Sequence, residues 1–429
     1  MNGWIIFVLL ILLMLTGMPI SIALGLTVLT FLFLMTDLPA ELVSQRLFTG
    51  LDQFAIMAIP FFILAGTFLT QGGVARRMIR FATALVGHLH GGLAMAGVFA
   101  CALFAAVSGS SPATVVAIGT ILIPAMEKQG YPRKFGVGSI GTAGALGILI
   151  PPSIVMVIYS VSTNTSVGKL FIAGIVPGIL LAAILMGITW VIARRRNYPR
   201  MQRADLKEIW SSFSDAIWGL LLIVVVIGGI YGGVFTPTEA AAVSAVYAFV
   251  VAVFVYRDLK LSDVPKVLLD SANMSAMLLY IITNAILFSF LLTSENIPQA
   301  MAQWIIDKHL SAWVFLLGVN ILLLIAGNFM EPSSIVLLLA PILFPVAMKL
   351  GVDPIHFGIV MTINMEVGLI HPPVGLNLYV ASGIARMGLT ETTVAFAPWI
   401  VIMVLYLLLV TYVPEIATWL PNAIYKVPD

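Results

Sequence analysis

Long apolar runs alternate with short polar breaks along almost the whole chain. A bilayer crossing needs about 20 apolar residues, and ten runs approach or exceed that length. They lie near residues 3–17, 20–36, 54–70, 135–163, 170–193, 218–235, 238–256, 276–293, 355–382 and 394–413. Residues 38–53 and 255–272 instead have the pattern of amphipathic surface helices. The pattern predicts an all-α polytopic membrane protein with five crossings in each half.

Between the third and fourth run of each half lies a longer apolar stretch with a polar centre. Residues 91–126 are interrupted by the sequence SGSSP, and residues 312–349 are interrupted by GNFMEPSS. Each limb has about 13 to 18 residues, which is short for a full crossing. We therefore predict two re-entrant helical hairpins, each entering and leaving the membrane on one side. Two ordinary crossings per stretch are the alternative.

The distribution of basic residues favours the re-entrant hairpins. With such hairpins, four connecting segments lie on one face and hold fifteen of the 21 Lys and Arg residues. Cytoplasmic loops are enriched in Lys and Arg, so this face is predicted to be cytoplasmic and the termini to lie outside or at the outer interface. Full crossings would divide the basic segments between the two faces. The segments are 71–90, 127–134, 194–207 and 257–266.

The two halves align with an offset of 221 residues, at which Gly147 matches Gly368 and Pro151 matches Pro372. Five crossings is an odd number, so the second half must be inverted relative to the first, as in many secondary transporters. We predict a first repeat, 1–207, and a second repeat, 208–429. Their parts are framework helices 1–36 and 218–256, hairpins 91–126 and 312–349, and broken helices 135–163 and 355–382.

Each half contains the pattern Gly-x-x-x-Pro-Pro inside an apolar run, at 147–152 and 368–373. Proline lacks an N–H donor and clashes with the preceding turn, so a proline pair breaks the helix. The freed carbonyls need partners at membrane depth, and hard cations such as Na⁺ prefer oxygen ligands. A simple proline kink is the alternative. The breaks and the hairpin tips predict two or more transported Na⁺ ions, with ligands from Ser108, Ser110, Gly144, Gly147, Pro151, Asn328, Glu331, Gly368 and Pro372.

The same tips and breaks offer donors for an anionic substrate. No arginine lies at membrane depth, so side-chain donors and half-helix N-termini would have to bind an anion. The candidates are Ser111, Thr114, Ser333, Ser334 and Asn377. Each serine has helix packing as its alternative role. Glu331 has the alternative of capping the half-helix that follows it.

Other polar residues near the breaks make the two sites chemically different. Asn364 and Glu366 precede the second break, whereas Thr142 and Ser153 flank the first. A carboxylate at membrane depth costs several kcal/mol unless it is paired or functional. Glu366 is therefore a candidate functional residue.

Composition excludes several other classes of function. Hydrophobic residues make up 61% of the chain and charged residues 9%, against about 25% charged residues in soluble domains. The net charge of +2 gives no indication of nucleic-acid binding, and Cys101 is the only cysteine, so no disulfide framework or zinc cluster is available. An intramembrane enzyme would need a Ser/His dyad, paired aspartates or a metal motif, and none is evident. A transporter is the leading hypothesis, and a scaffold or channel subunit is the alternative.

Eight segments spread over nearly the whole chain resemble those of a known family, the large membrane subunit (DctM type) of tripartite ATP-independent periplasmic (TRAP) transporters. They are IPFFILAG (59–66), GGVARR (72–77), SGSSPATV (108–115), GALGILIPPS (144–153), SVGKLFIAGIVPG (166–178), GGVFTPTEAAAV (232–243), GNFMEPSS (327–334) and PPVGLNLYV (372–380).

The resemblance implies a sodium-coupled, elevator-type importer of an organic acid in the bacterial inner membrane. It also implies two partners outside this chain: a small four-helix membrane subunit and a soluble periplasmic substrate-binding protein. The segments GNFMEPSS and GLNLYV are most similar to members that handle C4-dicarboxylates. A permease for another carboxylate, such as sialic acid, or a single-component sodium symporter is the alternative. His371 departs from the family pattern, which has threonine before the proline pair, and this puts the hydroxyl ligand of the second cation site in doubt.

Overall fold

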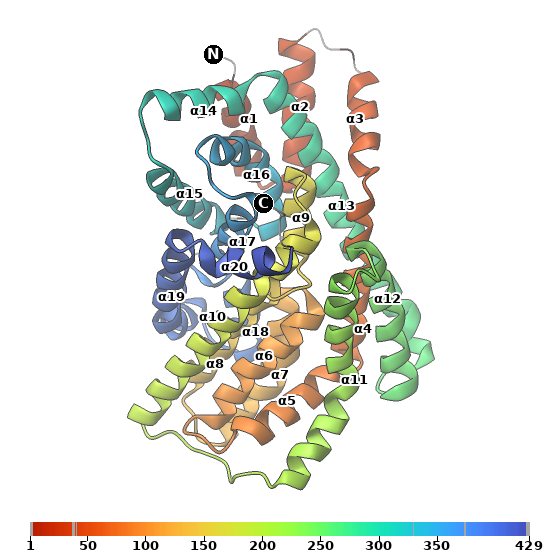
Figure 1. Cartoon of the computed structure of the whole chain (residues 1–429), viewed down its shortest axis with the longest axis vertical. Coiled ribbons are helices and arrows are strands. Elements are labelled where there is room, and N and C mark those ends of the chain that lie inside the picture. The colour runs from red at the N-terminus through yellow and green to blue at the C-terminus, as the bar shows by residue number, and fades with distance from the viewer. Residues whose placement is uncertain (1–2, 37–38, 40, 329, 373–374, 426–429) are drawn as a thin grey trace.

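The computed structural model describes residues 3–36, 39, 41–328, 330–372 and 375–425. Within these residues the chain folds into helices, turns and loops and contains no strand (Figure 1). Seven helices of the described part are long and apolar enough to cross a membrane, and shorter apolar helices accompany them. The all-α prediction is confirmed.

The first half begins with a pair of antiparallel helices and ends with the longest helix of that half. Its elements are α1 (Gly3–Leu15), α2 (Ile20–Met35), α3 (Glu41–Leu51), η1 (Phe54–Met57), α4 (Ala58–Gln71), α5 (Val74–Val86), α6 (Gly92–Ser108), α7 (Ser111–Lys128), α8 (Arg133–Ala143), η2 (Gly144–Ile148), α9 (Ile154–Thr163) and α10 (Val167–Arg195). The polar tip predicted near 108–112 joins α6 to α7, and the predicted break separates η2 from α9.

The second half has a similar order: a helix pair, one long helix in the place of α3 and α4, a short connecting helix, a hairpin, a broken helix, a long helix and a short final helix. Its elements are α11 (Leu206–Tyr231), α12 (Pro237–Val250), η3 (Val251–Val255), η4 (Leu261–Asp263), α13 (Val264–Ser294), α14 (Ile297–Asp307), α15 (Ala312–Gly327), α16 (Pro332–Lys349), α17 (Pro354–Ile370), α18 (Leu376–Ala385), α19 (Leu389–Tyr412) and α20 (Glu415–Ile424). The repeat boundary at 207/208 stays a prediction.

Side-chain caps begin several of these helices. Thr236 and Glu239 form a reciprocal capping box at the start of α12, with Pro237 at its first position. Ser166 accepts from the N–H of Lys169 at the start of α10, and Asp353 accepts from two N–H groups at the start of α17. Each such cap is worth about 1 kcal/mol. These local signals explain why the helices start where the sequence changes from polar to apolar.

The surface-helix prediction for 255–272 is wrong in its extent. A short loop follows η3, and α13 then runs unbroken from Val264 to Ser294. No glycine or proline interrupts the chain between Val267 and Ser294, so the amphipathic turns continue directly into the apolar helix. The corresponding segment of the first half does form the separate helix α3, whose side chains are mostly exposed.

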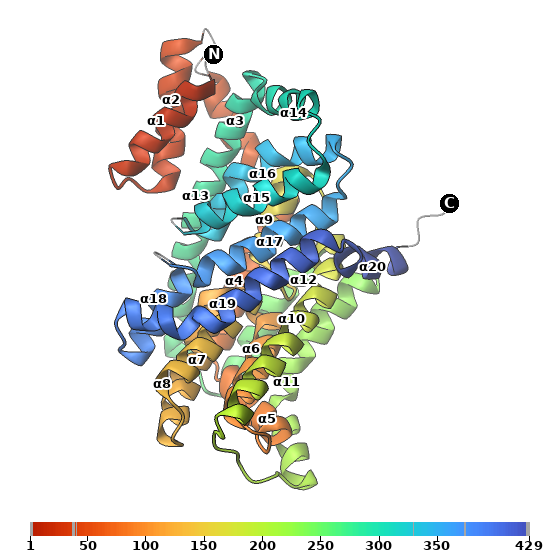
Figure 2. The ribbon, with the colours of Figure 1, turned by 90° about the vertical axis from the view of Figure 1, so that its left-hand side faces the viewer.

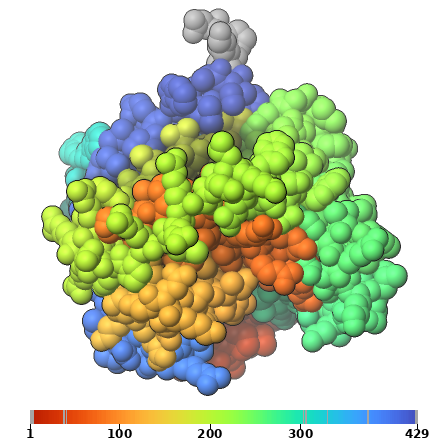
Figure 3. Space-filling model, turned by 90° about the horizontal axis from the view of Figure 1, so that it is seen from below, coloured from red at the N-terminus to blue at the C-terminus, as the bar shows by residue number. Residues whose placement is uncertain are grey.

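The four basic segments lie together at one end of the molecule. Gly91 donates its N–H to the carbonyl of Pro199, and the Tyr131 hydroxyl donates to the same carbonyl. Arg76 and Arg77 both form ion pairs with Asp258. Seen from below, the connection between α10 and α11 runs across this face beside α5 (Figure 3). The four segments therefore share one face of the molecule, and the cytoplasmic location of this face stays a prediction.

The helix α5 lies inside segment 71–90, which the sequence predicts only as a connection. Burial of Asp258 acts to raise the pKa of its carboxyl, but the hydrogen bonds and charges of Arg77 and Arg76 outweigh this and hold that pKa below its ordinary value. Arg80 forms a further ion pair with Asp215 on α11. The side chain of Arg76 is 65% exposed, so its ion pair contributes little stability and mainly sets geometry.

The two hairpins start from opposite ends of α10. Both limbs of the first hairpin end beside Pro199, next to the C-terminus of α10. The second hairpin ends near Asp353, which shares a cavity with Ser166 at the N-terminus of α10. A helix of 29 residues separates these points by roughly 43 Å at 1.5 Å per residue. The opposite orientation is the one that inverted repeats require.

In the core, helices of one half pack against helices of the other half. The hairpin helix α7 packs on α18, and its counterpart α16 packs on α9. In the same way α8 packs on α19, and α17 packs on α10 (Figure 2). Every residue of α17 from Ile355 to Ile370 is buried, as expected for a helix surrounded by protein. The broken helices are therefore the centre of the fold.

The predicted framework pairs, 1–36 and 218–256, lie at different places in the molecule. In Figure 1, α1 and α2 lie at the upper end, whereas α11 and α12 lie lower and to the right. The helix α2 packs on α13, α12 packs on α4, and α4 packs on α13. A rigid framework would therefore also have to include α4 and α13.

Candidate ion and substrate site

The tip of the first hairpin is a compact hydroxyl cluster. Gly109 adopts a left-handed conformation, with φ of 61°, and turns the chain between α6 and α7. Ser108 Oγ and Thr114 Oγ1 lie 2.9 Å apart, and Thr114 Oγ1 donates to the Ser110 carbonyl at 2.9 Å. Ser110 is the N-cap residue of α7, but its own side chain makes no capping hydrogen bond.

Glycines let this tip lie directly against the first break. A Cβ atom on Gly147 would lie 2.6 Å from the Ser110 carbonyl oxygen, and one on Gly109 would lie 2.8 Å from the Pro152 oxygen. Gly66 of α4 makes a similar approach to the Ser108 oxygen, at 2.9 Å. Backbone oxygen atoms from the tip and the break are thereby brought together.

The break between η2 and α9 is held by Ser153. Its hydroxyl donates to the Ile148 carbonyl at 2.5 Å and accepts from the Met156 N–H at 3.4 Å. The same side chain therefore joins the last turn before the break to the first turn after it. The predicted interruption of the helix at Pro151 is confirmed.

The tip of the second hairpin is organised by Glu331. Its carboxylate caps α16 by accepting from the Ser334 N–H at 3.2 Å. It also accepts from the Ser333 hydroxyl at 2.6 Å and from the Ser334 hydroxyl at 3.3 Å. The capping role is thus present, and both predicted serines are bonded to the cap.

The second break begins at His371, where α17 ends. His371 Nδ1 lies 2.7 Å from Asn328 Oδ1 of the second tip. A Cβ on Gly375 would lie 2.7 Å from both the Leu369 and the His371 carbonyl oxygens. These two carbonyls therefore converge beside Gly375. Pro373, the second proline of the predicted pair, lies outside the described residues.

Two facing glycines bring the second tip close to α17. A Cβ on Gly327 would lie 2.9 Å from the Gly368 Cα atom, and one on Gly368 would lie 2.9 Å from the Gly327 Cα atom. The backbones of α15 and α17 therefore touch immediately before the tip and the break.

The far side of the second break reaches the other hairpin. Asn377 Nδ2 donates to Ser111 Oγ at 2.8 Å and to the Gly141 carbonyl at 3.4 Å. Asn377 is fully buried, and its Oδ1 has no hydrogen-bond partner within the described ranges. The second break therefore contacts one hairpin tip through His371 and the other through Asn377.

A second group of buried polar residues lies beside this site. Asn364 donates to Asn320 at 2.8 Å, and Asn320 donates to Thr411 at 3.0 Å. Glu366 is fully buried, and neither carboxylate oxygen is hydrogen-bonded to any residue that the structure describes. The helix α17, which carries Glu366, packs against α10 and α19.

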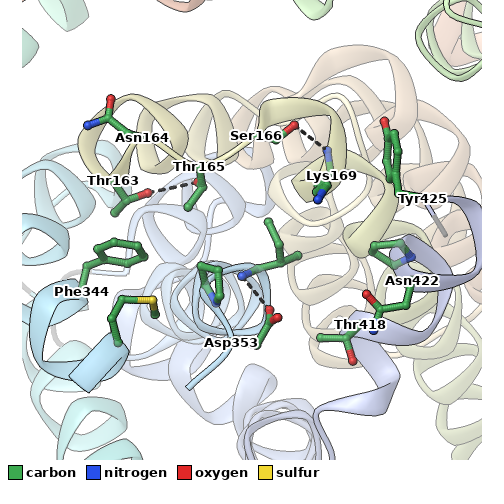
Figure 4. Close-up of a pocket in the computed structure, with 14 residues that line it drawn as sticks. Thr163, Asn164, Thr165, Ser166, Lys169, Phe344, Asp353, Thr418, Asn422 and Tyr425 are labelled. Atoms are coloured by element: carbon green, nitrogen blue, oxygen red, sulfur yellow. Dashed lines mark hydrogen bonds between the residues drawn. The ribbon is translucent and has the colours of Figure 1, made fainter. Parts of the chain in front are cut away.

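A separate cavity lies at the end of α10 that is remote from the basic segments. Its volume is about 360 Å³, and Figure 4 shows Lys169 and Asp353 among its polar lining residues. Asp353 is occupied with capping α17, and Lys169 lies over the ring of Tyr425. The cavity lining includes no predicted site residue. It marks the end toward which the second hairpin opens.

Comparison with known proteins decides the family. The profile of the tripartite ATP-independent periplasmic transporter, DctM component, matches residues 7–416. The chain belongs to this DctM family. It is a multi-pass membrane permease subunit and not an enzyme.

Relatives of this DctM permease cover almost its whole length. The C4-dicarboxylate TRAP transporter large permease protein DctM of Rhodobacter capsulatus is 66% identical, covering 98% of this chain and 99% of the relative. The sialic acid TRAP transporter large permease protein SiaM of Vibrio cholerae is 36% identical, covering 96% of each.

A solved structure shares the fold of this DctM permease. The YdaH transporter of Alcanivorax borkumensis superposes with a TM-score of 0.66 at 16% identity, covering 90% of this chain and 91% of that one. At this level of identity the likeness shows a common fold.

The structure of the DctM permease groups the predicted site residues into two places. One place is the first tip and the break beside it, with Ser108, Ser110, Ser111, Thr114, Gly144, Gly147 and Pro151. The other place is the second tip, with Asn328, Glu331, Ser333 and Ser334; Gly368 lies against its base, and Pro372 follows the end of α17. Asn377 packs against the first tip instead. The roles of these residues as ligands stay predictions.

Three features of the site were not predicted from sequence. One is the bond between His371 and Asn328, although His371 had been noted as unusual. Another is the pairing of Asn377 with Ser111 across the two halves, for which no sequence signal exists. The third is the convergence of carbonyls beside Gly375. In the described part of the chain no three His, Cys, Asp or Glu side chains come together, so a cation site here would consist mainly of neutral oxygen atoms.

Proposed function

We propose that this DctM permease imports a C4-dicarboxylate across the bacterial inner membrane by coupling it to Na⁺. The 66% identity to a C4-dicarboxylate permease, against 36% for a sialic acid permease, supports this substrate class. The observation that carries the proposal is the second break, which contacts both hairpin tips through His371 and Asn377. A ligand bound there would touch both halves.

Sodium binding is assigned to the places where backbone oxygens converge. The first site lies between the first tip and the first break, with oxygen ligands from Ser108, Ser110, Gly144, Gly147 and Pro151. The second site lies at the end of α17, with ligands from Gly368 and Pro372 and the converging carbonyls beside Gly375. Uncharged oxygen ligands suit a monovalent hard cation. Binding of Na⁺ would hold each tip against its break.

Transport is assigned to an elevator movement. The two hairpins, re-entrant in the bilayer, and the two broken helices would move together as one block. The helices α2, α4, α12 and α13 would form the static framework, since they pack on one another. Alternating access requires such a block to carry the bound substrate between the two faces. The Na⁺ gradient would drive the movement.

The permease would work within a three-part assembly. The family description itself is tripartite and periplasmic, which supports two partners: a small four-helix membrane subunit and a soluble substrate-binding protein. The binding protein would deliver the dicarboxylate to the outer face, at the end remote from the basic segments. The apolar side chains exposed on the long helices would contact lipid and the small subunit.

The test is succinate uptake into proteoliposomes that contain the permease and its small subunit. We expect uptake only when an inward Na⁺ gradient and the binding protein are both present. Removal of either should lower the initial rate to background. Full-rate uptake without Na⁺ and without the binding protein would reject the tripartite mechanism in favour of a single-component carrier. Uptake of sialic acid in place of succinate would reject the substrate class.

A further inference from the structure

The contact between His371 and Asn328 determines which amide atoms of Asn328 remain available to a ligand at the second tip. Asn328 Oδ1 can only accept hydrogen bonds, so the ring of His371 must donate to it through Nδ1–H at 2.7 Å. The amide Nδ2, which carries two N–H donors, is then not bonded to His371. These donors have no hydrogen-bond partner among the residues that the structure describes. The second tip therefore has N–H donors that a ligand could use.

Both side chains remain accessible to a ligand. Asn328 and His371 are each partly exposed, in contrast to the fully buried Asn377. The other polar groups of the second tip are already used, because Glu331 caps α16 and holds Ser333 and Ser334. Among the side chains that the structure describes at this tip, Asn328 has the donor that is left for an anion.

We propose that Asn328 donates its amide N–H groups to a carboxylate of the substrate, and that His371 is the positioning residue that sets this orientation. The proposal rests on the proposed function and refines it. It also changes the role expected for Asn328, because the oxygen that would bind Na⁺ accepts the His371 hydrogen bond instead. Asn328 becomes a residue that determines anion specificity.

A pair of nearly isosteric substitutions at His371 tests the positioning role. His371→Asn places an amide N–H near the position of Nδ1 and should keep the KM for succinate within about threefold of wild type. His371→Asp offers only acceptors, so it should turn the Asn328 amide around and present its oxygen to the substrate. The KM should rise about tenfold or more, since a hydrogen bond to a charged group is lost. His371→Leu, which adds no charge, should give an intermediate increase.

Substitution of Asn328 itself separates substrate binding from sodium binding. Asn328→Asp keeps the oxygen facing His371 but loses the donors, so it should raise the succinate KM about tenfold or more while the Na⁺ concentration for half-maximal uptake changes less than about twofold. The measurements use the permease, its small subunit and the binding protein in proteoliposomes, with each variant's folded amount checked by size-exclusion chromatography.

Two outcomes would overturn the inference while wild-type uptake remains sodium-dependent. One is equal succinate KM values for His371→Asn and His371→Asp. The other is an Asn328→Asp or Asn328→Ala variant that changes only the Na⁺ requirement, which would make Asn328 a sodium ligand. Absence of sodium-dependent succinate uptake by the wild type would instead be a failure of the proposed function.

Discussion

The two hairpin tips occupy equivalent places in the two halves but have opposite electrostatics. The first tip leaves the N-terminus of α7 without a side-chain cap, because Ser110 makes no capping bond. The second tip places the carboxylate of Glu331 on the N-terminus of α16. A helix N-terminus carries a partial positive charge and free N–H groups. The first tip can offer these N–H groups to an anion. At the second tip the Ser334 N–H is bonded to Glu331, and the proposed anion donor is the Asn328 side chain instead.

The hydroxyl groups of the two tips also differ in whether they bond to a charged group. At the first tip, Ser108 and Thr114 bond to each other and to the tip backbone, which keeps the turn rigid without adding charge. At the second tip, Ser333 and Ser334 both donate to Glu331. Equivalent positions in a repeat can therefore share a backbone geometry and still have different partners.

The largest effect is expected where the first tip touches its break. Gly147→Ala would place a Cβ 2.6 Å from the Ser110 oxygen and 2.8 Å from the Ser111 Cα atom. Both neighbours are backbone atoms, so the tip itself must move. Overpacking costs about 1–3 kcal/mol, and we expect the initial rate of succinate uptake to fall at least about tenfold.

Two further alanine variants control and extend this measurement. Gly383→Ala on α18 meets nothing within 4 Å and should transport like wild type. Gly368→Ala, whose Cβ would lie 2.9 Å from Gly327 Cα, displaces the second tip instead. Comparable losses in Gly147→Ala and Gly368→Ala would mean that both tips are needed. A Gly147→Ala variant with normal uptake would show that close packing at the first tip is dispensable.

The arrangement of elements was largely predictable because the signals are local. Pro151 and Pro372 remove donors from apolar runs, and the helices end near them. The repeat offset predicted that both halves would contain a hairpin and a broken helix. The exchange of helices between the halves was not predictable in this way, since periodicity says nothing about which buried helix contacts which.

The site was less predictable because its contacts are long-range. Asn377 and Ser111 are 266 residues apart, and no spacing rule links them. The sequence allows Glu331 to be a helix cap or a ligand, and its hydrogen bonds to Ser333 and Ser334 show the cap. The charge of Glu366 makes it unusual in an apolar run, but the packing of its helix α17 against α10 and α19 depends on the tertiary structure.

An added carboxylate would make the first tip resemble the second. Ser110→Asp would add a carboxylate at the N-cap of α7, as Glu331 does for α16. An acidic cap favours the helix but occupies its N-terminus and repels an anion. We expect the succinate KM to rise about fivefold to tenfold, measured by uptake at saturating Na⁺. Ser110→Asn, a neutral cap of nearly the same size, should give a smaller increase. Equal effects of the two would mean that charge at this tip does not govern substrate binding.

The smallest effect is expected from changing the cap at the second tip. Glu331→Gln keeps one oxygen that can accept the Ser334 N–H bond, but it removes the charge and replaces the oxygen that accepts from the Ser333 hydroxyl with an NH2 group. Because the cap itself is kept, succinate uptake should change less than about threefold. Glu331→Ala also removes the acceptor and should lower the stability of the folded permease by about 1 kcal/mol, the usual worth of an N-cap. Thermal unfolding of the purified protein measures this loss, and uptake at saturating Na⁺ measures the function. If Glu331 were a sodium ligand, Glu331→Gln would raise the Na⁺ concentration for half-maximal uptake severalfold with little change in thermal stability. That result would contradict the proposed difference between the tips, because the Glu331 carboxylate would then bind Na⁺ and would not act mainly as the cap of α16.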